Sequence, residues 1–161
     1  MDREDLGLKL KQFYLLEAYQ VKFFDGQIPS LDNEHTVKAY EHMVEVERQH
    51  VDYFAEKLGE YGFDLPDPAD DAFASAGFVS AKALDLFSLA EKFKVGIAVE
   101  TKASEKYGEF IKMAGDEKAL TKRLWHNRID EEFHKYWFAA NLEALTGIEN
   151  RIAPVSETSW R

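Results

Sequence analysis

The hydrophobic residues of this chain recur every three or four positions over most of its 161 residues, which is the spacing of one face of an α-helix. Leu, Ala, Glu and Lys, which favour helices, are abundant, and Gly and Pro lie mostly between the periodic segments. We therefore expect an all-α, four-helix bundle over 1–147, followed by a C-terminal tail over 148–161. The four long helices are predicted at 3–24, at 33–58, in a stretch that ends at 114, and at 117–145.

The longest predicted connection joins the second and third helices. It begins with the segment 61–71, whose two prolines predict a loop that crosses the bundle. The helical pattern from 72 to 114 is too long for one bundle helix, because a rise of ~1.5 Å per residue would make it longer than about 60 Å. We expect a break near 77–82, and thus an extra short helix before the third bundle helix. Gly96 predicts a second weak point.

Six polar residues interrupt the apolar helix faces in a repeated pattern. The first and third helices each carry one glutamate there, and the second and fourth each carry Glu-x-x-His. The spacing is nearly the same in the two halves, since Glu47 follows Glu17 by 30 positions and Glu131 follows Glu100 by 31. This is the ligand set of a dinuclear metal site inside a four-helix bundle. The six residues are Glu17, Glu47, His50, Glu100, Glu131 and His134.

The predicted ligands restrict the metal. Carboxylate oxygen and imidazole nitrogen suit iron, manganese or zinc, and four carboxylates neutralise two divalent cations. We expect two Fe ions, and the same ligands also admit manganese or a mixed Mn/Fe pair. The three other histidines, His35, His42 and His126, are expected at surface or capping positions.

Further residues are predicted around the metals. A metal-bound histidine usually donates its other N–H to a carboxylate, and Asp130 is expected to reach His50 in this way. Val46 occupies the corresponding position in the other half, so we expect His134 to have a different partner. Tyr107 lies seven positions after Glu100 on the same face, and is either a catalytic phenol beside the metals or a core residue. The small residues Gly96 and Ala103 are expected to leave space for substrate and O₂.

Composition excludes several classes of function. There is no Cys, so the chain has no disulfide, thiolate metal site or Cys nucleophile. The 30 acidic residues against 20 basic ones argue against a nucleic-acid-binding surface. The N-terminus has no apolar signal region, so we expect a cytoplasmic protein. Two interpretations of the apolar segment 72–93 are open. It is a helix that packs on the bundle or in a dimer interface, or it is a peripheral membrane contact that admits a lipophilic substrate.

The set of six residues resembles that of the ferritin-like di-iron carboxylate superfamily, and within it the chain is most similar to the demethoxyubiquinone hydroxylase family. Gly26-Gln27 follows Glu17 by nine and ten positions, as in the first helix of that family. The gap of 53 positions from Glu47 to Glu100 is similar to its long connection. The string Val-Gly-Ile-Ala-Val-Glu100, followed by Tyr107, resembles its third-helix motif. The resemblance covers residues 10–145.

The resemblance implies a ferritin-like monooxygenase that uses O₂ to hydroxylate a quinone-like, apolar substrate, with electrons from an external donor, in a homodimer. The chain departs from that family at 12–16, where QFYLL replaces a basic stretch, and at Glu105-Lys106, which replaces paired histidines. The alternative is a ferroxidase or peroxide-consuming iron-handling protein of the rubrerythrin or bacterioferritin type. Arg48 replaces the haem-binding Met of bacterioferritins, and Ala103 replaces the extra glutamate of rubrerythrins.

Overall fold

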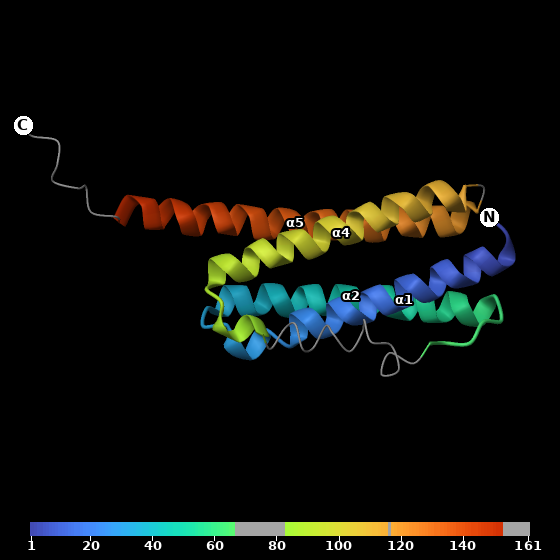
Figure 1. The fold of residues 1–161 in the computed structure, drawn as a ribbon, viewed down its shortest axis with the longest axis horizontal. Helices are drawn as coiled ribbons and strands as arrows, with labels where there is room; N and C mark the ends of the chain where they lie inside the picture. The colour runs from blue at the N-terminus through green and yellow to red at the C-terminus, as the bar shows by residue number, and fades with distance from the viewer. Residues whose placement is uncertain (67–82, 116, 153–161) are drawn as a thin grey trace, which may run out of the picture.

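The computed structural model describes residues 1–66, 83–115 and 117–152, and this part of the chain is helical without strands. Two helical hairpins lie side by side, with α1 packed mainly on α2 and α4 mainly on α5 (Figure 1). The prediction of an all-α bundle of four long helices is therefore confirmed. The elements are α1 (Arg3–Asp25), η1 (Ile28–Ser30), α2 (Glu34–Glu60), η2 (Leu84–Leu86), α4 (Leu89–Ala114) and α5 (Lys118–Ile152).

Side-chain caps fix where three of the helices begin. The Asp2 carboxylate accepts a hydrogen bond from the Asp5 backbone N–H before α1. The Asn33 side chain accepts from two backbone N–H groups at the start of α2. Ser88 and Glu91 form a reciprocal capping box at the start of α4. These bonds satisfy backbone N–H groups that have no partner within the first turn of a helix, and so they stabilise the start of each helix.

Glycine marks the helix ends less sharply than predicted. Gly115 has a φ of +50° and ends α4 as expected. In contrast, α4 continues through Gly96 and α5 continues through Gly147 to Ile152, so the predicted weak point and the predicted helix end are wrong. One glycine inside a helix costs only ~1 kcal/mol, which a long helix tolerates.

Parts of the predicted connection and tail lie outside the described residues. These parts are 67–82, which include the predicted break and extra short helix, and 153–161 of the predicted tail. Before α4 the described chain includes the 3-10 turn η2. No helix in the described ranges is long and apolar enough to cross a membrane.

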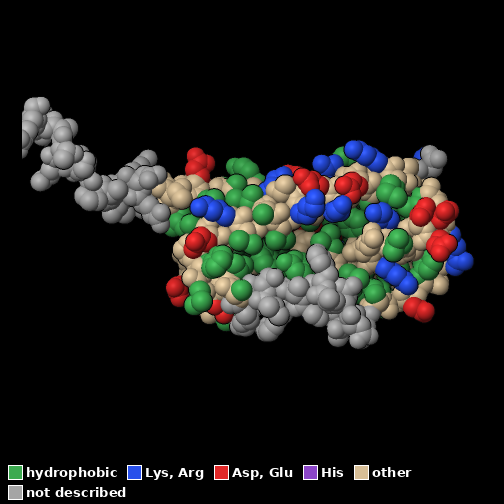
Figure 2. Space-filling model, in the orientation of Figure 1, with side chains coloured by type: hydrophobic (Ala, Val, Ile, Leu, Met, Phe, Trp, Pro, Cys, Tyr) green, Lys and Arg blue, Asp and Glu red, His purple; other side chains and the backbone are tan. Residues whose placement is uncertain are grey.

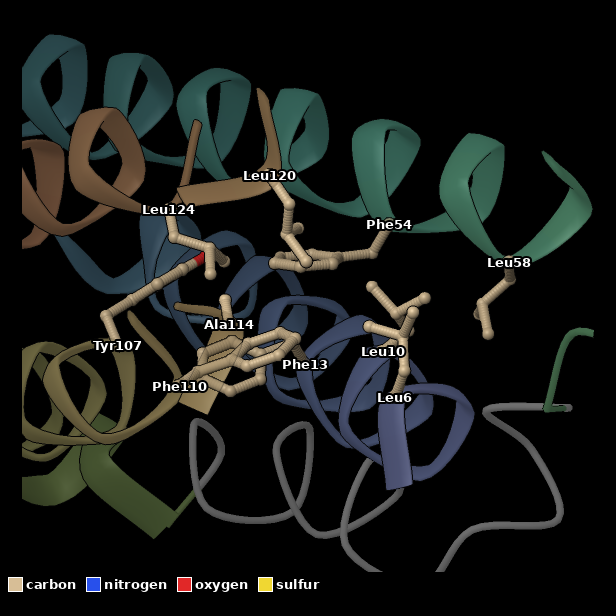
Figure 3. Close-up of a cluster of buried hydrophobic side chains, with 10 residues drawn as sticks. All are labelled: Leu6, Leu10, Phe13, Phe54, Leu58, Tyr107, Phe110, Ala114, Leu120 and Leu124. Carbon is tan, nitrogen blue, oxygen red and sulfur yellow. The ribbon is translucent and has the colours of Figure 1, made fainter. Parts of the chain in front are cut away.

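Two apolar clusters fill the bundle, and each draws side chains from several helices. In the first cluster, Phe13 of α1 packs on Tyr107 of α4, and their ring centroids are 4.7 Å apart (Figure 3). The first comprises Leu6, Leu10, Phe13, Phe54, Leu58, Tyr107, Phe110, Ala114, Leu120 and Leu124. The second comprises Phe23, Phe24, Tyr40, Met43, Val44, Leu84, Phe93 and Phe138.

On each long helix, the predicted metal ligands lie between the residues that belong to the first cluster and those that belong to the second. Along α1, for example, Glu17 lies between Phe13 of the first cluster and Phe23 of the second. The bundle therefore holds a polar layer with an apolar layer on either side. On the outside, apolar side chains are visible along the seam between α1 and α4, with charged groups around them (Figure 2).

Candidate metal centre

All six predicted ligands meet in the middle of the bundle. One donor atom each from Glu17, Glu47, His50 and Glu131 lie within 4.8 Å of one another, and these residues are called the His50 group. The same holds for Glu47, Glu100, Glu131 and His134, called the His134 group. His134 is 6% exposed and the other five residues are fully buried. Each long helix contributes, and the Glu-x-x-His spacing places both side chains of α2, and both of α5, on one face.

In the His50 group, the imidazole Nδ1 atom faces three carboxylates. It lies 3.0 Å from Oε2 of Glu47, 3.4 Å from Oε2 of Glu17 and 3.6 Å from Oε1 of Glu131. One N–H cannot donate to three acceptors, and the shortest contact, to Glu47, is the hydrogen bond. Several oxygen atoms therefore converge on one point with too few donors to bind them.

In the His134 group, the arrangement is similar. Nδ1 of His134 lies 3.0 Å from Oε1 of Glu47 and 3.4 Å from Oε1 of Glu100. Glu47 thus directs its two oxygens apart, with Oε2 toward His50 and Oε1 toward His134. Glu47 therefore presents one carboxylate oxygen to each of the two groups.

Three buried carboxylate oxygens in this centre have no hydrogen-bond partner among the described residues. They are Oε2 of Glu17, Oε1 of Glu100 and Oε1 of Glu131. Leaving such an atom buried and unpaired costs about 1–3 kcal/mol. Cations would satisfy these atoms, and carboxylate and imidazole donors suit iron, manganese or zinc. The buried cluster can therefore hold metal ions.

Three carboxyl groups of the centre, those of Glu17, Glu47 and Glu100, have shifted pKa values in the metal-free protein. Burial, and then the charge of Glu131, raises the pKa of Glu17 well above its ordinary value of 4.5. The same two causes raise the pKa of Glu100. Burial would also raise the pKa of Glu47, but its contacts with the two imidazoles outweigh burial and hold this pKa below its ordinary value. The centre therefore retains protons on some carboxyl groups where surface glutamates are ionised.

The imidazoles are also shifted toward their protonated forms. Burial alone would lower the pKa of His50, but contacts with carboxylates, that of Asp130 first, raise it well above its ordinary value. The pKa of His134 is raised in the same way, chiefly by Glu47. Protons thus supply the positive charge that the buried carboxylates need in the metal-free protein. Metal ions must displace these protons, because imidazole and carboxylate bind metals in their deprotonated forms.

The residues that surround the centre differ between the His50 group and the His134 group. Nε2 of His50 lies 3.2 Å from Oδ2 of Asp130, the contact expected from the sequence. Among the described residues no such partner faces Nε2 of His134. The Tyr107 hydroxyl donates to Oε1 of Glu17 at 2.7 Å and accepts from Nδ2 of Asn127 at 3.0 Å. Tyr107 is fully buried in the first apolar cluster, so it is both a core residue and a neighbour of the centre, while its catalytic role stays a prediction.

The prediction that Gly96 and Ala103 leave space beside Glu100 is partly wrong. A Cβ added to Gly96 would lie 2.8 Å from the Phe138 ring, so that ring fills the space. Ala103 is fully buried. The predictions for His35, His42 and His126 are confirmed, since all three are exposed.

One polar residue at the centre was not identified from the sequence. Gln20 is fully buried, and its Nε2 atom lies 3.1 Å from Oε2 of Glu131, 3.3 Å from Oε2 of Glu100 and 3.4 Å from Oε1 of Glu47. Its position, one helical turn after Glu17 on the inner face of α1, was the available signal. Asn127, which donates to the Tyr107 hydroxyl, is a second buried polar residue near the centre.

Comparison of the chain with protein-family models, with curated proteins and with solved structures finds no match.

Proposed function

We propose that the chain is a ferritin-like, dinuclear metal oxidoreductase that activates O₂, with two iron ions held by the six residues of the His50 and His134 groups. The observation that carries the proposal is the placement of Glu47, whose two oxygens face two different imidazoles. A mononuclear site would not need a carboxylate whose two oxygens face two different imidazoles. Two adjacent iron ions supply the capacity to bind and reduce O₂, and manganese could replace one or both.

The proposed reaction is the hydroxylation of an apolar organic substrate. A C–H bond, one O₂, two electrons and two protons give a C–OH group and one water molecule. The electrons come from an external reductant, because the chain has no Cys to bind an iron–sulfur cluster.

A groove between α2 and α5 supports an apolar, ring-containing substrate. Its volume is about 540 Å³, in the range of small-molecule sites. His134 is one of its lining residues, and apolar and aromatic side chains also line it, including Met43, Phe133, Tyr136 and Trp137. Phe133 is 66% exposed and Tyr136 is 71% exposed, so the groove is open to solvent. A flat apolar molecule in this groove would lie against a ligand of the centre.

Three associated predictions remain proposals. They are the quinone-like nature of the substrate, a homodimer, and a peripheral membrane contact through 72–93, of which 72–82 lie outside the described residues.

The proposal is tested by loading the metal-free chain with Fe²⁺ without oxygen and then adding O₂. With a reductant and a simple lipophilic quinone or phenol, we expect two irons per chain, O₂ consumption, and product that carries one oxygen atom from ¹⁸O₂. Oxidation of many irons per chain, without organic product, would instead indicate an iron-handling protein that uses O₂ or peroxide. Bound iron with no response to either oxidant would contradict an oxidoreductase of any kind.

A further inference from the structure

The buried amide of Gln20 contacts only one side of the centre. Its Nε2 atom reaches Oε1 of Glu47, Oε2 of Glu100 and Oε2 of Glu131. The oxygens that face His50 are different atoms, namely Oε2 of Glu47 and Oε1 of Glu131, together with Oε2 of Glu17. The amide therefore lies among the oxygens of the His134 group and leaves those that face His50 untouched.

We propose that Gln20 is a placeholder in the metal-free protein, which binds the oxygens of the His134 group until a cation displaces it, so that the two metal positions fill in order. This inference rests on the proposed dinuclear centre. The His50 group fills first, and the His134 group fills second because its donors must first be released from the amide.

The contacts of Gln20 suit a group that can be displaced. An amide nitrogen has two N–H groups, so it cannot satisfy three oxygens at once. The distances of 3.1, 3.3 and 3.4 Å are at or beyond the long end of the N–H···O range. The amide oxygen, Oε1, is buried and has no hydrogen-bond partner among the described residues. Apart from the contacts of Nε2, no hydrogen bond within the described residues therefore holds the amide in this orientation.

The other half of the bundle has no equivalent group. Gln20 lies three positions after Glu17, and the matching position after Glu100 is Ala103, which has no donor. The His50 group is instead supported from outside by Asp130. The His50 group thus has a carboxylate behind its imidazole, while the His134 group has an amide among its oxygens, which makes the two groups unequal.

The test is a titration of the full metal-free chain with Mn²⁺, followed by calorimetry and by electron paramagnetic resonance. For the wild type we expect two binding steps, with isolated Mn²⁺ ions at one equivalent. In Gln20→Met, which keeps the size but removes the donors, the second step should strengthen by about tenfold or more, since hydrogen bonds to carboxylates no longer compete. Spin-coupled Mn²⁺ pairs should then appear before one equivalent has been added.

Gln27→Met is the matched control. Gln27 is also a buried glutamine near the end of α1, but its Nε2 atom donates to the Phe23 carbonyl and not to the centre. This variant should bind Mn²⁺ as the wild type does. If Gln20→Met does not fold, as judged by circular dichroism, Gln20→Ala replaces it.

The outcomes separate this inference from the proposed function. Wild-type protein that binds no pair of Mn²⁺ ions would overturn both. Two bound ions with an unchanged second step in the Gln20 variant would overturn the placeholder role alone. A weaker second step would also overturn it, because Gln20 would then be a ligand through Oε1.

Discussion

Nε2 of His50 lies 3.2 Å from Oδ2 of Asp130, although the two residues are on different helices and 80 positions apart in the chain. The contact ties α2 to α5 and directs Nδ1 of the same imidazole toward the buried carboxylates. It therefore couples the packing of the two hairpins to the orientation of a proposed metal ligand.

Replacing Asp130 by Asn should weaken metal binding without unfolding the protein. The amide oxygen can still accept from Nε2, but the charge that makes the imidazole a better ligand is lost. We expect the affinity of the first metal to fall by about 10-fold or more, as for other groups that support ligands. Calorimetric titration measures this, with Asp52→Asn on the exposed side of α2 as control. An unchanged affinity would contradict the supporting role of Asp130.

Replacing Glu100 by Ala should remove one metal position and preserve the helical fold. Glu100 belongs to the His134 group alone, so the His50 group keeps all its ligands. We expect one metal ion per chain instead of two, measured by elemental analysis after loading, with an unchanged circular dichroism spectrum. The control is Glu105→Ala on the exposed face of the same helix. Two ions in the Glu100 variant would show that α4 contributes no ligand.

Replacing Tyr107 by Phe should destabilise the metal-free protein. The change leaves Oε1 of Glu17 without its donor and Nδ2 of Asn127 without its acceptor, both in a buried region. The expected loss is about 1–3 kcal/mol in the free energy of unfolding, measured with urea. Tyr40→Phe is the matched control, because the Tyr40 hydroxyl is buried without a hydrogen-bond partner among the described residues. Equal losses in both variants would contradict a specific role of the Tyr107 hydroxyl.

The stability of the metal-free protein should fall as the pH rises. Glu17 and Glu100 have pKa values above their ordinary 4.5, so the folded protein binds more protons than the unfolded one above that pH. The raised pKa of His134 acts in the same direction above 6.5, and so does that of His50. The lowered pKa of Glu47 acts oppositely, and its contribution is lost only below 4.5.

Metal binding should show the complementary dependence, since it releases these protons and so strengthens with pH. Urea unfolding at about pH 6 and about pH 8, with and without Mn²⁺, measures both effects. A metal-free protein that is more stable at the higher pH would contradict the assigned protonation of the centre.

Replacing Gly96 by Val should destabilise the bundle. Its side chain would meet the Phe138 ring, which lies 2.8 Å from the position of an added Cβ, and overpacking of this kind costs typically about 1–3 kcal/mol. Gly147→Ala is the control in the neighbouring helix, where an added Cβ has nothing within 4 Å. There we expect a gain of up to ~1 kcal/mol from helix propensity. Thermal unfolding of the two variants should thus shift in opposite directions.

The sequence was sufficient to predict the bundle and to bring the six acidic and imidazole residues together. Helical periodicity identifies the inner face of each helix, and a charged residue on such a face is conspicuous because burial makes it costly. The repetition of Glu and Glu-x-x-His in the two halves made the pattern specific. That these residues bind metal, and that the protein is an oxidoreductase, stays a prediction.

Features that depend on contacts between helices could not be read from periodicity. Gln20 lies on an inner face, but an uncharged residue without a counterpart in the other half gives no repeated signal. The space beside Gly96 depends on the position of Phe138 on another helix, which the sequence does not reveal. The continuation of α5 through Gly147 shows that a glycine at a plausible helix end does not stop a long helix without further signals.

The most direct test of the account is the metal content, element by element, of the protein purified from its own host. Two ions per chain, mainly iron, are predicted for the wild type, and fewer than one for a variant with Glu47 and Glu131 both replaced by Gln. A wild type without transition metal that also fails to take up Fe²⁺ or Mn²⁺, or a double variant that still holds two ions, would contradict it.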